Sequence, residues 1–321
     1  MTEPETESAA KTLVVDAQTV RVVRAFRRVG IEPILLKGPA IANLLYANDS
    51  RTYVDTDLLI DAADQALAAE TLADLGYRQP PTGHVPRAPS TTWLRGTHGP
   101  EVDLHTGIWR WAPNDSLRAV LQANTKTLRV GRIELLVLDD AAQCVHIVTH
   151  ALQHQLSESG PNEDLSRALA LLPDSTWQRA VRVSDEVGAA DAFLAGLFAS
   201  PEGRGLAGRI GIDRAVAPDL DLELAVAGTL WSGALQFEAL AQAQGVRARL
   251  AVIQDRLFPP LDYARMQLDR GDETLSGVIY LLWWWRLCRK TPTALGAWIR
   301  ARRAVEAWRN RNPHGWQVNR A

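Results

Sequence analysis

The first 140 residues alternate between short apolar runs and segments with apolar residues at helical spacing. Val14 to Val29 predicts a helix that ends at Gly30, a residue type that commonly closes helices. Pro33 to Lys37 and Tyr53 to Ile60 predict strands, and Pro39 to Tyr46 predicts a helix with proline in its first turn. The pattern further predicts a helix over Ala63 to Leu75, strands around Tyr77 and over Thr91 to Arg95 and Glu101 to His105, a helix over Asn114 to Ala123, and a hairpin over Thr127 to Val137.

Beyond Asp139 the chain is rich in alanine and leucine at helical spacing and has few strand signals. Helices are predicted over Ala141 to Leu156, Asp164 to Leu171, Thr176 to Val187, Ala190 to Ala199, Leu222 to Ala243 and Arg247 to Leu257, with two more near the C-terminus. Ser200 to Gly211 contains four glycines and a proline and predicts a loop. We therefore expect a disordered leader at residues 1–10, an α/β domain at 11–139 and a helical domain at 140–321.

Composition adds a few limits. With 321 residues and a formal net charge of −2, the chain can bury a sizeable core and carries no global charge that favours nucleic acid. Cys144 and Cys288 lie far apart in apolar stretches, which is typical of buried thiols in a reducing compartment. The opening residues are acidic and polar, the reverse of a signal peptide, and no apolar run approaches the ~20 residues of a membrane span. We expect a cytoplasmic protein.

The candidate chemistry begins with Asp55 and Asp57 in the strand Tyr53 to Ile60. Side chains two apart on a strand point the same way, so the two carboxylates share one face and repel each other. A divalent cation relieves that repulsion, and carboxylate oxygens favour magnesium or manganese. Asp103, between Val102 and Leu104, has the same setting on a predicted neighbouring strand. Three such carboxylates can hold two metal ions that bind a nucleotide's phosphates and activate an attacking oxygen.

These residues lie in an ordered set of motifs: Leu36-Lys37-Gly38, Arg51, Asp55-Thr56-Asp57-Leu58-Leu59 and Val102-Asp103-Leu104-His105. The set resembles the nucleotidyltransferase superfamily built on the DNA-polymerase-β palm, in particular an uncharacterised bacterial branch. The resemblance covers roughly residues 30 to 110, and a weaker match to the family pattern follows at His150 and at Asp164-Leu165. It implies an α+β fold, in which a polymerase-β-like palm with a mixed sheet and helices precedes an all-helical C-terminal domain.

The resemblance also implies roles. Asp55 and Asp57 would bind both metal ions, and Asp103 would hold the catalytic one and accept a proton from the acceptor hydroxyl. The superfamily usually opens with a Gly-Ser turn, and Lys37-Gly38 stands in its place here, so the lysine and the turn are expected to bind the triphosphate. Arg51 would either neutralise the leaving pyrophosphate or form a surface salt bridge. His105 would line the site, by contacting phosphate or orienting Asp103, or else be a structural histidine.

Two other features have competing interpretations. His146, His150 and His154 recur every four residues along one helix face, which fits a polar seam facing the cleft or the palm better than a zinc site, since no HExxH motif is present. Trp283-Trp284-Trp285 precede a segment, residues 286–321, with nine Lys/Arg and one acidic residue. Consecutive tryptophans cannot all face one side of a helix, so at least one is expected to be exposed. The cluster would serve domain packing or a partner or substrate surface.

The function expected from these features is metal-dependent transfer of a nucleoside monophosphate, with two Mg²⁺ or Mn²⁺ ions. The donor would be a nucleoside triphosphate and the acceptor a hydroxyl or phosphate on a small molecule or peptide, with release of pyrophosphate. One alternative is a catalytically inactive palm that binds nucleotide or protein. Another is an enzyme that modifies nucleic-acid ends such as those of tRNA, which the near-neutral charge disfavours.

Overall fold

The computed structural model describes residues 3–46, 51–80, 90–96, 99–112, 121–154, 159–270 and 274–312. The first helix, α1, spans Glu3–Arg28 and is followed by Gly30 with a φ of 85°, which confirms the predicted helix end. The helix begins at Glu3, within the segment predicted as a disordered leader. Glutamate and alanine are good helix formers, so this polar segment extends the helix that follows it. The helix predicted over Asn114 to Ala123 lies mostly outside the described residues.

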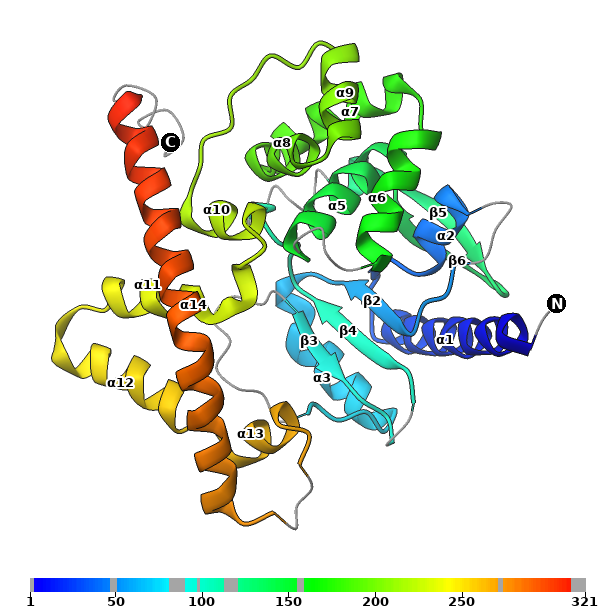
Figure 1. The fold of residues 1–321 in the computed structure, drawn as a ribbon. Helices are drawn as coiled ribbons and strands as arrows, with labels where there is room; N and C mark the ends of the chain where they lie inside the picture. Colours follow the sequence, from blue (N-terminus) through cyan, green and yellow to red (C-terminus); the bar gives the residue numbers. More distant parts are fainter. Residues whose placement is uncertain are drawn as a thin grey trace.

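Among the described residues, six strands form one mixed sheet in the order β3-β4-β2-β1-β6-β5 (Figure 1). The strands are β1 (Ile34–Leu35), β2 (Asp55–Leu59), β3 (Ser90–Trp93), β4 (Glu101–His105), β5 (Thr125–Val130) and β6 (Ile133–Leu138). β2 pairs in parallel with β4 and antiparallel with β1, and β1 is parallel to β6. β5 and β6 form the predicted hairpin around Gly131.

The two faces of the sheet are covered by different apolar clusters. Leu58, Val102 and Leu104 pack on the side of α1 and of α3 (Gln65–Asp74). Leu59 points to the opposite side, where α2 (Pro39–Leu45) and α5 (Asp140–Gln153) supply the packing. Because side chains alternate along a strand, Asp57 shares the second face with Leu59. The predicted strand alternation thus places the carboxylates between the sheet and α5.

The remaining helices follow α5 in sequence. They are α6 (Ser159–Leu171), α7 (Asp174–Glu186), α8 (Ala190–Ala199), α9 (Pro201–Arg209), α10 (Leu220–Val226), the π-helical turn η2 (Leu230–Ala234), α11 (Leu235–Gln242), α12 (Gly245–Leu257), α13 (Leu261–Gln267) and α14 (Ser276–Arg311). One apolar cluster runs from Leu59 on β2 to Leu206 on α9, so the first helices after α5 share a core with the sheet. The domain boundary predicted near residue 139 therefore stays a prediction, since the core crosses it.

Two helix predictions need correction. The loop expected over Ser200 to Gly211 is largely helix α9: the Ser200 side chain accepts a hydrogen bond from the Gly203 N–H, Pro201 takes the first helical position and Leu206 is buried. The single helix expected over Leu222 to Ala243 is broken into α10, η2 and α11. Gly228 and Gly233 have φ of 65° and 95°, backbone conformations that interrupt the helix.

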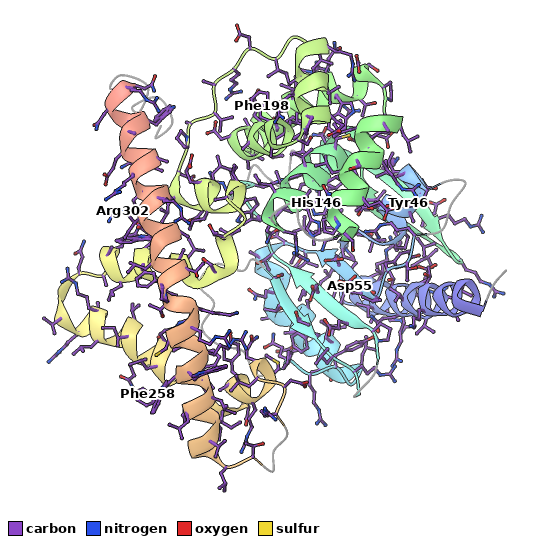
Figure 2. The ribbon with its side chains drawn as sticks, viewed as in Figure 1. Tyr46, Asp55, His146, Phe198, Phe258 and Arg302 are labelled. Atoms are coloured by element: carbon purple, nitrogen blue, oxygen red, sulfur yellow. The ribbon has the colours of Figure 1, made fainter. Side chains whose placement is uncertain are left out.

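The segment from α12 to α14, residues 245–312, forms an arm at one side of the molecule (Figures 1 and 2). Trp283 is 5% exposed in a small core with α13, whereas Trp285 on the same helix is 60% exposed. The prediction that the three tryptophans cannot share one environment is confirmed. The expected burial of both cysteines holds for Cys144 but is wrong for Cys288, which lies on the exposed side of α14.

Within the described residues, no helix is long and apolar enough to cross a bilayer. The mixed sheet followed by a helical region confirms the predicted α+β class.

Candidate active site

A tight turn between β1 and α2 positions Lys37. Gly38 has a φ of 57° and a ψ of −117°, and a Cβ at this position would lie 3.3 Å from Cδ2 of Tyr53. Pro39 then starts α2 at its first position. A side chain at position 38 would therefore strain the turn and crowd Tyr53, and this close approach explains the Lys-Gly-Pro sequence.

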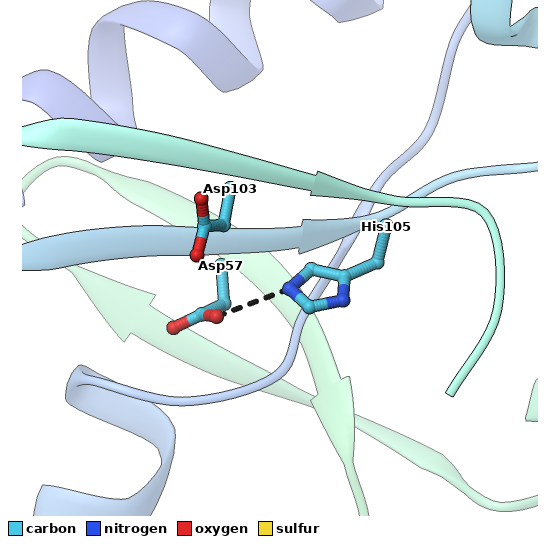
Figure 3. A group of neighbouring side chains, drawn as sticks. All are labelled: Asp57, Asp103 and His105. Carbon is cyan, nitrogen blue, oxygen red and sulfur yellow. Dashed lines mark hydrogen bonds and ion pairs between the residues drawn. The ribbon is translucent and has the colours of Figure 1, made fainter. Parts of the chain in front are cut away.

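The parallel pairing of β2 with β4 brings the predicted carboxylates together. Asp57 lies opposite Asp103 in the register, and His105 follows two residues later on the same face of β4. Ligand atoms of Asp57, Asp103 and His105 all lie within 4.8 Å of one another (Figure 3). Among the described residues, this is the one group whose geometry could hold a metal ion.

Asp57 is the centre of the cluster and is 1% exposed. Its Oδ1 lies 2.7 Å from Nζ of Lys37 and 3.1 Å from Nε2 of His105. Burial alone would raise the pKa of this carboxyl, but Lys37 and His105 outweigh that effect and hold the pKa well below its usual value. Oδ2 of Asp57 is buried and has no hydrogen-bond partner within the described structure.

Asp55 lies on the same strand face but outside that group of three. Burial, followed by repulsion from Asp57, raises its pKa to about 6, although Lys37 acts in the opposite direction. The sequence prediction that Asp55 and Asp57 repel each other is therefore reflected in the site's electrostatics. The metal-binding roles of both residues remain proposals.

The side chain of Asp103 is oriented by Thr92, a residue that was not predicted from the sequence. Thr92 on β3 pairs directly with Asp103 across the antiparallel β3–β4 ladder, and its hydroxyl donates to Oδ1 of Asp103 over 2.7 Å. His105, which was considered as an orienting group for Asp103, instead contacts Asp57. The signal for Thr92 is its register opposite Asp103, which becomes visible only when the strands are paired.

Helix α5 closes the same side with its histidine row. His146 is 3% exposed. Burial has the largest effect and lowers its pKa to about 3; the charge of Lys37 acts in the same direction, and Asp57 opposes this shift. Burial and the same lysine also hold the pKa of His150 well below its usual value. Both rings are therefore neutral near pH 7, and they lie tilted against each other along the helix, with centroids 5.7 Å apart. This agrees with a polar seam facing the palm; Figure 2 labels His146 on α5 and Asp55 on β2.

Gln143 is another residue missed from the sequence. Its Nε2 donates to the carbonyl oxygen of Leu36 over 3.1 Å, so it ties α5 to the backbone directly before Lys37. The side chain is 2% exposed. In the sequence, the available signal was this glutamine, which lies one helical turn before His146.

Arg51 lies before β2 and is committed to an ion pair. Its Nε and Nη2 lie 2.9 and 2.7 Å from the two carboxylate oxygens of Asp164 on α6. The Tyr46 hydroxyl donates to the same carboxylate over 2.8 Å. Of the two alternatives for Arg51, the structure therefore shows the salt bridge, although the pair is largely buried rather than on the surface.

The residues present fit a hard divalent cation. Two carboxylates on adjacent strands supply the oxygen donors that Mg²⁺ and Mn²⁺ prefer, and the imidazole of His105 lies beside them. The unpaired, buried Oδ2 of Asp57 is an acceptor that a cation would satisfy.

A protein family matches more than half of this chain. The family described as "Uncharacterised nucleotidyltransferase" matches residues 1–201, which include every residue of the predicted site. No curated protein matches the chain.

Several solved structures match part of the chain at low sequence identity. The lincomycin-bound lincosamide antibiotic adenylyltransferase LnuA is 14% identical, with a TM-score of 0.32 over 48% of this chain and 95% of that one. The antibiotic-resistance factor ANT(2'')-Ia is 12% identical, with a TM-score of 0.39 over 55% and 93%. An antigenic nucleotidyltransferase-like protein from Paracoccidioides brasiliensis is 15% identical, with a TM-score of 0.36 over 70% and 94%.

Proposed function

The chain belongs to the uncharacterised nucleotidyltransferase family, and we propose that it transfers a nucleoside monophosphate in a metal-dependent reaction. The observation that carries the proposal is the pairing of Asp57 with Asp103 on adjacent strands, with one buried carboxylate oxygen of Asp57 left without a hydrogen-bond partner among the described residues. A nucleoside triphosphate would be the donor, and pyrophosphate the second product.

Asp57 and Asp103 would hold the divalent cation, and Asp55 would contribute once its carboxyl is ionised. When bound, the cation supplies positive charge at the phosphates and lowers the pKa of the attacking hydroxyl. Two Mg²⁺ or Mn²⁺ ions are proposed, because three carboxylates on one sheet face can be shared between two ions.

In the proposed reaction, an acceptor oxygen forms a bond to the α-phosphorus of the triphosphate. The bond from that phosphorus to the oxygen bridging the α- and β-phosphates breaks, and pyrophosphate leaves with the bond electrons. Asp103 takes the proton of the acceptor hydroxyl. Thr92 donates a hydrogen bond to Oδ1 of Asp103 and so orients this carboxylate.

The Lys37-Gly38 turn would bind the phosphates next to the carboxylates. Lys37 is held at 2.7 Å from Asp57, so its ammonium is already beside the proposed phosphate position. His105 would line the same place. Arg51 would act indirectly, by holding the entry of β2 against α6 through Asp164.

We propose a small molecule or a peptide as the acceptor, as expected from the resemblance of the motifs to the nucleotidyltransferase superfamily. The charge distribution disfavours a nucleic-acid acceptor, because residues 1–244, which contain the site, carry 31 Asp/Glu against 21 Lys/Arg. We propose a cytoplasmic location, because both cysteines are free thiols, as is usual in a reducing compartment.

The experiment that tests this function follows the label from two forms of each NTP, one labelled at the α-phosphate and one at the γ-phosphate. The protein is incubated with Mg²⁺ and a mixture of peptides and small metabolites. Nucleotidyl transfer places the α-label on an acceptor and the γ-label in pyrophosphate, and Asp57→Asn abolishes both. Transfer of the γ-label to an acceptor would identify phosphoryl transfer instead and contradict the proposal.

A further inference from the structure

Lys37 is positioned as the counter-cation of the whole carboxylate cluster. Its Nζ lies 2.7 Å from Oδ1 of Asp57, and its side chain is 17% exposed. Burial lowers the pKa of Lys37, but the attraction of Asp57, Asp55 and Asp103 outweighs this effect and the pKa is raised. The Lys37 ammonium therefore neutralises part of the carboxylate charge that a bound divalent cation would neutralise.

We propose that Lys37 and the metal ion compete for Asp57, and that the triphosphate resolves this competition by taking over the lysine. The inference rests on the proposed function. A divalent ion at Asp57 would lie close to the Lys37 ammonium, and two cations at such a distance repel in a poorly hydrated site. The triphosphate brings negative charge, so the ammonium gains a new partner when it leaves Asp57.

The local structure suits such an exchange. Lysine is a compact charge on a flexible stem, and the rigid Gly38 turn fixes only its backbone. Asp57 keeps the contact with His105 after Lys37 departs, and its second oxygen remains open to a cation. A thermodynamic consequence follows: metal alone should bind weakly, nucleotide should strengthen metal binding, and metal should strengthen nucleotide binding by the same factor.

Calorimetry with Mn²⁺ as the probe, with and without a non-hydrolysable NTP, tests the exchange. Lys37→Met is expected to bind Mn²⁺ alone about tenfold more tightly than the wild type and to bind the Mn²⁺–nucleotide pair about tenfold more weakly. Lys126→Met, which removes a lysine paired with Asp140 outside the site, should match the wild type in both titrations. If Lys37→Met does not fold, Lys37→Gln carries the same prediction.

The outcomes separate this inference from the proposed function. Binding of Mn²⁺ by the wild type with unchanged Mn²⁺ affinity in the Lys37 variants would overturn the exchange and leave the function standing. Failure of both the wild type and the variants to bind Mn²⁺, with or without nucleotide, would overturn both.

Discussion

Arg51 and Asp164 are 113 residues apart in the chain and form a two-point ion pair, with N–O distances of 2.9 and 2.7 Å. The Asp164 side chain is 4% exposed and that of Arg51 16%. Tyr46 completes the contact through its hydroxyl, and the guanidinium of Arg167 lies 4.1 Å from the centre of its ring. This cluster joins the entry of the carboxylate strand to α6, so we expect it to stabilise the fold and align the site.

Asp164→Asn removes one charge from this buried pair and leaves the guanidinium without its counter-ion. We expect the free energy of unfolding to fall by about 3 kcal/mol, as for other buried pairs that lose one partner. Urea unfolding measures the loss.

The exposed pair Arg209–Asp174 provides the matched control, with both side chains about half exposed. Asp174→Asn should change the stability by less than about 1 kcal/mol, because solvent screens such pairs. Equal losses in the two variants would show that burial of the Arg51 pair has no energetic consequence.

Asp55→Asn should stabilise the metal-free protein. The folded-state pKa of Asp55, about 6, lies above its ordinary value of 3.8, so ionising this carboxyl costs stability as the pH rises through that interval. The cost is fully present above about pH 6 and corresponds to on the order of 3 kcal/mol. Urea unfolding in chelator at pH 5 and pH 8 should show a larger gain for the variant at pH 8. A gain that is the same at both pH values would argue against strained ionisation of Asp55.

Most helices and strands could be predicted from local sequence patterns. Period-two and period-3.6 spacing and the glycine stops predicted α1, β2, the hairpin and α8 because local sequence determines them. The segment after Ser200 is an exception. Its glycines predicted a loop, but the Ser200 cap and the burial of Leu206 stabilise helix α9. Tertiary packing overrode the local propensity there.

The site was predictable where it depends on one strand and not where it depends on pairing. Asp55, Asp57 and Asp103 follow from strand alternation. Thr92 required the β3–β4 register, and the Arg51–Asp164 pair required the packing of α6 on the sheet. Neither can be obtained from the spacing of residues in a single sequence.

Thr92→Val removes the hydroxyl that orients Asp103 while keeping a branched side chain on β3. If Asp103 accepts the acceptor's proton, loss of one orienting hydrogen bond should lower kcat by about tenfold, equivalent to roughly 1.4 kcal/mol. Thr92→Ser keeps the hydroxyl and should restore most of the activity. Steady-state kinetics of both variants, with unfolding curves, test this role; equal kcat in Thr92→Val and the wild type would exclude it.

The proposed function requires that the Asp57–Asp103 cluster bind a metal–nucleotide complex. The most direct measurement is a calorimetric titration of each of the four NTPs, with and without Mg²⁺, into the wild type and Asp57→Asn. We predict that at least one NTP binds the wild type in a Mg²⁺-dependent manner and that Asp57→Asn removes this binding. Binding of no NTP, or equal binding without Mg²⁺ and in the variant, would contradict metal–nucleotide binding at this cluster.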